Sequence, residues 1–261
     1  MTEAIDPTAG FRASYRVRFD EAGPDGALRA SGLLRYTQDV AARDSEALGY
    51  DRAWYAARGL TWLVRTAELD IGAAIPYGSV LTGTTRVVGF RRVWSRRETT
   101  FALPDGLTAA TVRIDWVLLD EKGSPARIPA ELEQVFAAPP ATLQLARVTP
   151  GEPPPDAARR PFRVRPQELD PMDHVNNAAY ADWLDESILE ADGAAGPAPT
   201  SAIPRRVRLE YARAAERGES LDSVCWRSDG GWSCLIARAG DGAELLRGRL
   251  ELAGGGQTRA P

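Results

Sequence analysis

The stretch Asp170-Pro-Met-Asp-His-Val-Asn-Asn-Ala-Ala-Tyr-Ala-Asp-Trp-Leu-Asp-Glu186 contains the only histidine of the chain and the start of an amphipathic helix. Apolar side chains recur at helical spacing from Tyr180 to Ala191, and acidic side chains occupy the other positions. Asn176 and Asn177 are suited to accept hydrogen bonds from the unpaired amides of the first turn. The pattern therefore predicts a helix with one buried face and a polar start.

The loop before this helix carries the candidate catalytic groups. Pro171 disfavours helical backbone at the residue before it, so Asp170 and His174 are predicted to lie in that loop. The free amides and the positive dipole end of a helix N-terminus suit a carboxylate, or a carbonyl oxygen that gains negative charge. We therefore predict an active site here. On these residues alone, a simple capping loop is the alternative reading.

A sequence repeat organises the rest of the chain. Tyr15-Arg-Val-Arg18 returns as Phe162-Arg-Val-Arg165, an offset of 147 residues (162 − 15), and at the same offset Tyr36 falls on Trp183. A repeat of this length indicates a duplicated domain. A proline-rich run over residues 149–156 marks the join. We expect an N-terminal domain over residues 11–140, a linker over 141–161 and a C-terminal domain over 162–253.

Each copy is predicted to hold one long helix and several strands. In the first copy, apolar spacing predicts the helix over residues 31–48, closed by Gly49. Alternating segments predict a first strand at residues 15–18 and further strands at 61–71, 79–90, 93–103, 109–119, 203–212, 221–228, 231–239 and 243–252. Several strands after one long helix favour an α+β fold in which an antiparallel sheet wraps the helix.

The two copies differ at the candidate site. Where the second copy has Asp170 and His174, the first has Gly23 and Ala27. We infer a pseudo-dimer with one active site, in which the first copy supplies the opposite wall of the substrate channel.

Composition excludes several classes of function. A hydrophobic fraction of 44% and a charged fraction of 26% are ordinary for a globular protein, and no apolar run approaches the length of a membrane span. The net charge of -4 gives no general attraction to nucleic acid or to an anionic membrane. The first residues lack the pattern of a signal peptide, so we expect a cytoplasmic protein. Cys225 and Cys234 lie on predicted neighbouring strands and could face each other across a hairpin, but in a reducing compartment we expect two free thiols that bind no metal.

The motif Asp-x-x-x-His-Val-Asn-Asn-x-x-Tyr-x-x-Trp resembles the signature of hotdog-fold thioesterases, specifically the second half of acyl-ACP thioesterases. The first half is similar to the same family in Gly59-Leu-Thr-Trp-Leu-Val-Arg65 and in Arg113-Ile-Asp-Trp-Val-Leu-Leu-Asp120. The resemblance covers about residues 11–252. It implies a double hotdog, two antiparallel sheets each wrapped around a long central helix. It also implies hydrolysis of a fatty acyl thioester on acyl carrier protein, without metal or organic cofactor.

The resemblance also assigns roles to residues. Asp170 would act as general base for a water molecule or as direct nucleophile, and His174 would orient it or protonate the leaving thiolate. Backbone amides around Val175, Asn176 and Asn177 would bind the substrate carbonyl as it becomes an oxyanion. Asp173 competes with Asp170 for the role of base, although the match to hotdog loops favours Asp170.

The sequence departs from the family at two places. Met172 stands where the family usually has an asparagine, and Ala214-Ala215 stands where its plant members carry Glu-Cys. A cysteine nucleophile is therefore excluded. Glu216 lies two residues from the family's glutamate position, and we expect it to substitute only if the loop shifts.

Alternatives and partners follow from the same residues. An acyl-CoA thioesterase, a hotdog hydratase and a catalytically inactive acyl-binding pseudo-thioesterase are the rival functions. The fused halves predict a monomer, with a homodimer as the other possibility.

Arginine-rich runs at residues 91–97 and 205–217 are candidate docking sites for acidic carrier protein. The alternative interpretation is that they form solvated strand faces, as charge runs usually do. Tryptophans at positions 54, 62, 94 and 116 are candidates to line an acyl channel or pack the core.

Overall fold

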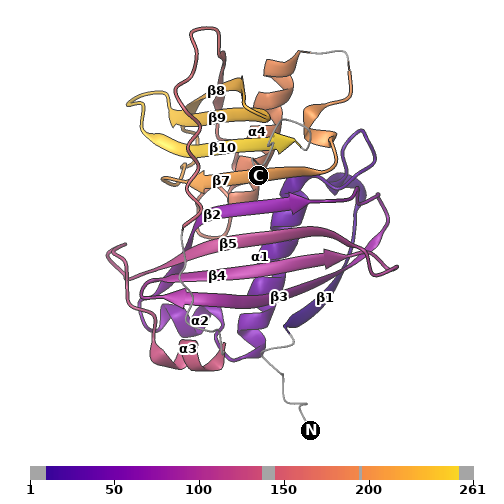
Figure 1. Ribbon diagram of the computed structural model, residues 1–261. Coiled ribbons are helices and arrows are strands. Elements are labelled where there is room, and N and C mark those ends of the chain that lie inside the picture. The colour runs from indigo at the N-terminus through magenta and orange to yellow at the C-terminus, as the bar shows by residue number, and fades with distance from the viewer. Residues whose placement is uncertain (1–9, 137–144, 194–195, 253–261) are drawn as a thin grey trace, which may run out of the picture.

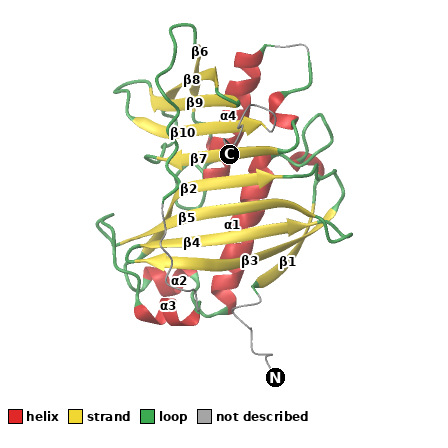
Figure 2. Ribbon diagram, in the orientation of Figure 1, coloured by secondary structure: helices red, strands yellow, loops and turns green. Residues whose placement is uncertain are grey.

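The computed structural model describes residues 10–136, 145–193 and 196–252. Ten antiparallel strands form one continuous sheet in the order β1-β3-β4-β5-β2-β7-β10-β9-β8-β6 (Figure 1). Two long helices, α1 and α4, lie behind this sheet in the view of Figure 2. The first five strands and α1 come from the first copy of the repeat, and the last five strands and α4 come from the second. The predicted α+β double hotdog is therefore confirmed.

The elements follow the predicted order closely. The first half contains β1 (Phe11–Arg16), α1 (Ala30–Ala47), α2 (Arg52–Ala56), β2 (Thr61–Ile71), β3 (Val80–Arg91), β4 (Trp94–Ala102), β5 (Thr108–Leu119) and α3 (Ala130–Val135). The second half contains β6 (Ala158–Arg163), α4 (Asn177–Asp192), β7 (Arg205–Tyr211), β8 (Ser220–Ser228), β9 (Gly231–Arg238) and β10 (Glu244–Leu252). Short 3-10 turns occur at Phe19–Glu21, Pro166–Glu168 and Pro199–Ser201.

Both long helices bury the faces that their spacing predicts. In α4, Trp183, Leu184 and Ile188 are fully buried, Glu186 and Glu190 are exposed, and Asp182 and Asp185 are half-buried at the edge of the polar face. The helix approaches the sheet closely at Gly248, where a Cβ atom would lie 2.9 Å from Leu184 Cδ1. Glycine at this point in β10 therefore lets the sheet pack directly on α4.

The two halves join edge to edge. Strand β2 pairs with β7, with Glu68 opposite Arg208 in the register. Behind the sheet, Arg35 Nη2 of α1 donates to Asp182 Oδ2 of α4 over 2.9 Å, across a sequence separation of 147. Equivalent positions of the two copies thus touch each other, as expected at the axis of a pseudo-two-fold.

The duplication extends to individual hydrogen bonds. Tyr36 donates its hydroxyl proton to Glu21, and Trp183 Nε1 donates to Glu168 Oε1 over 3.0 Å at the matching place in the second half. Each glutamate also accepts from the backbone N–H three residues before it. The offset read from the sequence therefore describes a structural repeat.

The segment between the halves crosses the sheet on the face opposite the helices. Val148 is buried there, and its N–H donates to Glu210 Oε2 over 2.9 Å. Strand β6 begins at Ala158, so the strand includes the last residues of the range predicted as linker. Part of that range, residues 141–144, lies outside the described residues.

Two features differ from the expectations. Cys225 and Cys234 lie directly opposite each other on β8 and β9 and form a disulfide, so the expectation of free thiols is wrong. Helix α3 was not predicted, because its six residues are too short to show an apolar period.

No helix among the described residues has the length and apolarity needed to cross a membrane.

Candidate active site

The candidate site is a tight loop over residues 169–175, here called the second-half loop. Leu169 and Val175 form an isolated antiparallel bridge at its neck, and Asp170 N–H donates to His174 O over 2.8 Å. Asp173 lies in the left-handed region, with φ of 60°. The structure therefore brings Asp170 and His174 together through the backbone.

The first copy has the same loop with other side chains. In this first-half loop, over residues 22–28, Gly23 N–H donates to Ala27 O over 2.8 Å, and Ala22 and Leu28 form the neck. The loop geometry is therefore independent of the catalytic candidates. Only the second copy places a carboxylate and an imidazole on it.

The Asp170 carboxylate is fixed on one side and open on the other. Oδ1 accepts a hydrogen bond of 2.8 Å from the Met172 N–H, so residues 170–172 form an Asx turn. Oδ2 has no hydrogen-bond partner among the described residues. The Met172 side chain is exposed, so the residue that replaces the family asparagine contributes its backbone amide to the loop.

His174 is exposed, and its imidazole makes no hydrogen bond within the described chain. Its backbone pairs with Glu216 in an isolated antiparallel bridge. Residues directly opposite each other in such a pair have side chains on the same face, with Cβ atoms about 5 Å apart. Glu216 therefore faces His174 without the loop shift that we expected it to need. Only the pairing of the two loops reveals this neighbour.

The amides at the start of α4 are not equally available. Val175 N–H donates to Ala215 O over 3.2 Å, and Asn176 N–H donates to Glu168 O over 2.9 Å. Asn177 N–H has no acceptor within the described residues. Of the three predicted substrate-binding residues, Asn177 thus offers the open backbone donor.

Asn176 joins the two halves as well as capping the helix. Its Oδ1 accepts the Ala178 N–H over 2.9 Å, and its Nδ2 donates to Gln38 Oε1 of α1 over 3.2 Å. Both readings of this residue, cap and orienting group, therefore have a structural basis.

We expect Asn176→Ala to lower the free energy of unfolding by about 1 kcal/mol, because the variant loses the N-cap of α4. Asn176→Asp keeps the capping oxygen and is the matched control. Urea denaturation of both variants measures the effect. An unchanged midpoint in Asn176→Ala would show that the cap contributes nothing to stability.

Two buried tyrosines hold the loop after β7 against α4. Tyr180 Oη accepts the Ala215 N–H over 2.8 Å, and Tyr211 Oη donates to Asn177 O over 3.0 Å. Burial raises the pKa of Tyr180 to about 12, and burial likewise raises the pKa of Tyr211. Both phenols therefore stay neutral and act as fixed hydrogen-bonding groups.

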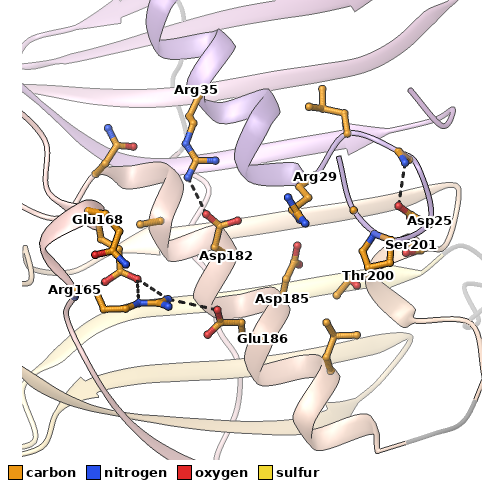
Figure 3. Close-up of a pocket in the computed structure, with 18 of the residues that line it drawn as sticks. Asp25, Arg29, Arg35, Arg165, Glu168, Asp182, Asp185, Glu186, Thr200 and Ser201 are labelled. Carbon is orange, nitrogen blue, oxygen red and sulfur yellow. Dashed lines mark hydrogen bonds and ion pairs between the residues drawn. The ribbon is translucent and has the colours of Figure 1, made fainter. Parts of the chain in front are cut away.

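A cavity of about 720 Å³ lies between the two halves (Figure 3). It reaches the neck of the second-half loop at Leu169 and Asn176, but Asp170 and His174 do not line it. Charged side chains dominate its wall: Asp25, Arg29, Arg35, Arg165, Glu168, Asp182, Asp185, Glu186 and Arg205. The cavity is therefore polar, in contrast to an acyl channel.

Three of the four candidate tryptophans pack within apolar clusters. Trp54 and Trp62 pack beside α2 and α3 in a small cluster that includes Phe136, and Trp116 packs against the main core. None of the four candidate tryptophans lines a described cavity.

Several arginines of the two arginine-rich runs form ion pairs with carboxylates of other elements. Arg96 Nε donates to Asp115 Oδ1 over 2.6 Å, and Arg97 pairs with Asp44 in a buried contact. In the second run, Arg206 pairs with Asp70 over 2.5 Å. These three side chains have carboxylate partners within the protein, and docking of carrier protein on the other arginines of the two runs stays a prediction. Arg213 is exposed, and Arg217 forms an exposed ion pair of 2.6 Å with Asp173 of the second-half loop.

No cluster of three or more His, Cys, Asp or Glu side chains suited to a metal occurs in the described part of the chain.

The comparisons with known proteins agree with this architecture. The acyl-ACP thioesterase from Bacteroides thetaiotaomicron superposes with a TM-score of 0.76 at 15% identity, covering 92% of this chain and 96% of that one. The 12:0-ACP thioesterase from Umbellularia californica gives a TM-score of 0.73 at 20% identity, with the same coverage of 92% and 96%. These similarities show that the fold is a double hotdog.

Family models and curated relatives carry the assignment further. The model of the acyl-ACP thioesterase N-terminal domain matches residues 8–136, and that of the C-terminal domain matches residues 151–244. This chain belongs to the acyl-ACP thioesterase family. It is 25% identical over 269 residues to the chloroplastic palmitoyl-acyl carrier protein thioesterase of Cuphea hookeriana, covering 92% of this chain and 61% of that protein. The corresponding Arabidopsis thaliana protein is 24% identical over 276 residues, with 92% and 63% covered. The chain thus spans about three fifths of the length of these curated relatives.

Proposed function

We propose that this chain is a thioesterase that hydrolyses fatty acyl-ACP to free fatty acid and acyl carrier protein. The observation that carries the proposal is the open Oδ2 of Asp170, held in the same loop as His174 at the N-terminus of α4. Family membership supports the reaction type. We also propose that residues 11–140 and residues 162–253 form two hotdog domains joined by a linker.

In the proposed mechanism, Asp170 supplies the base. Its Oδ1 is tied to the Met172 amide, so Oδ2 is the oxygen that takes a proton from water or attacks the thioester carbonyl itself. A fixed carboxylate loses little conformational freedom on reaching the transition state, which favours catalysis by positioning.

The developing oxyanion lies at the start of α4 in this proposal. Asn177 N–H is the open donor, and the positive end of the helix dipole adds to it. One well-placed donor of this kind is typically worth about 3 to 4 kcal/mol of transition-state stabilisation. When water is the nucleophile, collapse of the intermediate breaks the C–S bond and gives the free acid directly. When Asp170 is the nucleophile, the same collapse leaves an acyl-aspartyl anhydride, and a water molecule then hydrolyses it to the free acid and the Asp170 carboxylate.

His174 protonates the departing thiolate, and Glu216 is proposed as its positioning residue. The backbone pairing that places Glu216 opposite His174 supports this role. Glu216→Gln is then expected to lower kcat while KM stays the same. A purely structural role for Glu216 would change stability and leave kcat intact.

The carrier is tested by direct comparison of substrates. We expect kcat/KM to be at least about tenfold higher for acyl-ACP than for acyl-CoA at matched chain length, because carrier protein adds contacts that CoA lacks. Initial rates over C8 to C18 substrates measure both preferences. Equal or faster turnover of acyl-CoA would assign the CoA carrier. Rates no higher than buffer alone would make this chain an acyl-binding pseudo-thioesterase.

Location and assembly belong to the same proposal. A cytoplasmic location and a monomeric pseudo-dimer, with a homodimer as the alternative, are the forms we propose for the working enzyme. Light scattering coupled to size-exclusion chromatography distinguishes the two assembly states.

A further inference from the structure

The polar cavity lies on the side of the first-half loop, which lacks the catalytic side chains. Its wall is formed by this loop, by Arg29 just before α1, by the outer face of α4 and by Arg205 at the start of β7. Asp185 projects from α4 toward Arg29 (Figure 3). The mechanism proposed above uses none of these side chains.

The repeat explains why the cavity is open on this side. At the offset of 147 residues, Arg29 corresponds to Asn176 and Asp185 corresponds to Gln38. Asn176 and Gln38 close their side of the interface with a hydrogen bond of 3.2 Å. Arg29 and Asp185 form no hydrogen bond or ion pair with each other within the described residues. Space for a bound group therefore remains between them.

Two arginines in the wall have unused donors. Arg29 Nη1 donates to Asp20 O over 3.1 Å, and Arg205 Nη1 donates to Ala202 O over 2.9 Å. Neither side chain forms an ion pair in the described part of the chain, whereas the neighbouring Arg35 pairs with Asp182 over 2.9 Å. A guanidinium carries five N–H donors in a planar fork that matches carboxylate and phosphate oxygens.

We propose that this cavity is a second ligand site, lined by neither Asp170 nor His174, which binds a small organic anion bearing a carboxylate or a phosphate between Arg29 and Arg205. The volume of about 720 Å³ is in the range of small-molecule sites. Leu28, Leu169 and Leu189 add apolar wall beside the charged groups and suit a short hydrocarbon attached to the anion.

Asp185 makes anion binding depend on pH. Burial raises the pKa of Asp185 to about 7, with Arg205 and Arg29 opposing the rise and Asp182 and Glu186 adding to it. The last two carboxylates pair with Arg35 and Arg165. Asp25, whose pKa is lowered by Ser201, Ala27 and Arg205 against the opposing effect of burial, stays ionised in the first-half loop.

The sign of the effect follows from these charges. Below pH 7, Asp185 is neutral and the two arginines are free to bind an anion. Above pH 7, its negative charge competes for them and repels the ligand. Anion binding therefore takes up a proton, and we expect the affinity for a carboxylate ligand, whose own charge is constant in this range, to fall about tenfold between pH 6 and pH 8.

Calorimetric titration of the full chain with sodium octanoate and, separately, with inorganic phosphate tests the proposal at both pH values. Arg205→Gln is expected to weaken binding at least tenfold. Asp185→Asn is expected to bind tightly at both pH values, because the repelling charge is gone. Arg52→Gln, at an exposed position of α2, is the matched control and should bind like wild type.

Each outcome decides the proposal. Octanoate binding alone assigns a carboxylate ligand, and phosphate binding alone assigns a phosphate ligand. No binding of either probe at millimolar concentration would overturn the proposal, as would binding that Arg205→Gln leaves unchanged in a variant with a wild-type thermal transition. The titrations involve no hydrolysis, so their failure is separate from any failure of the thioesterase assignment.

Discussion

Asp170→Asn is expected to lower kcat for acyl-ACP hydrolysis by about 10² to 10⁴-fold, the usual range for loss of a positioned general base. Asparagine keeps an oxygen that can accept the Met172 N–H, so the loop should retain its shape while the proton acceptor is lost. Steady-state rates of thiol release give kcat and KM for the variant and the wild type.

The KM of this variant separates chemistry from binding. A base acts in the transition state, so KM should stay within about twofold of the wild-type value. A raised KM with an unchanged kcat would show that Asp170 positions the substrate. In that case, the neighbouring Asp173 becomes the candidate base.

Asp44→Ala is expected to cost about 3 to 5 kcal/mol of stability, because it leaves the buried Arg97 charge without its partner. Both side chains are only 8% exposed, and the pair links the last turns of α1 to β4. The Arg97 guanidinium also lies over the Phe136 ring at 5.4 Å, which does not compensate the lost carboxylate. Urea denaturation followed by tryptophan fluorescence measures the change.

A double variant shows where that cost arises. Asp44→Leu combined with Arg97→Met removes both charges and should recover most of the lost stability, since buried ion pairs are often replaceable by apolar groups. Arg86→Met, which breaks an exposed pair with Glu98, is the matched control and should cost less than about 1 kcal/mol. A loss in Asp44→Ala no larger than that of the control would contradict the buried-charge account.

Much of the fold follows from local pattern. Residues 61–71 were predicted as a strand from alternation, and β2 occupies Thr61–Ile71. The offset that aligns Tyr36 with Trp183 likewise predicts one long helix in each copy, and α1 and α4 are these helices. Periodicity works here because each long element has one buried face, and a buried face leaves its period in the sequence.

The pairing of a strand of the first half with a strand of the second half could not be predicted from the sequence. The edge-to-edge contact of β2 with β7 depends on which strands are left at the edges once both sheets are formed. The facing of Cys225 and Cys234 across a hairpin, in contrast, could be read from the sequence, and only the disulfide between them was not expected. We expected free thiols because we assumed a reducing cytoplasm, whereas the strand register brings the two cysteines together and they form a disulfide.

The candidate site was predicted in part. Asp170, His174 and the helix start could be read from adjacent residues. Glu216 opposite His174 could not, because backbone pairing between two loops sets their distance. The partners of Arg96, Arg97 and Arg206 could not be read either, since these carboxylates come from other strands and from α1. Sequence alone shows the charge of a residue and not its partner.

The proposed mechanism needs the Asp170 carboxylate in the second-half loop. A comparison with a second aspartate that makes the same kind of backbone hydrogen bond tests this most directly. Asp105 caps the turn between β4 and β5 by accepting the Leu107 N–H over 3.0 Å, as Asp170 accepts the Met172 N–H. Fatty acid released from acyl-ACP is measured for Asp170→Asn and Asp105→Asn beside the wild type. The account predicts near-complete loss of product in the first variant and wild-type release in the second. Undiminished release by Asp170→Asn, with both variants folded, would contradict it.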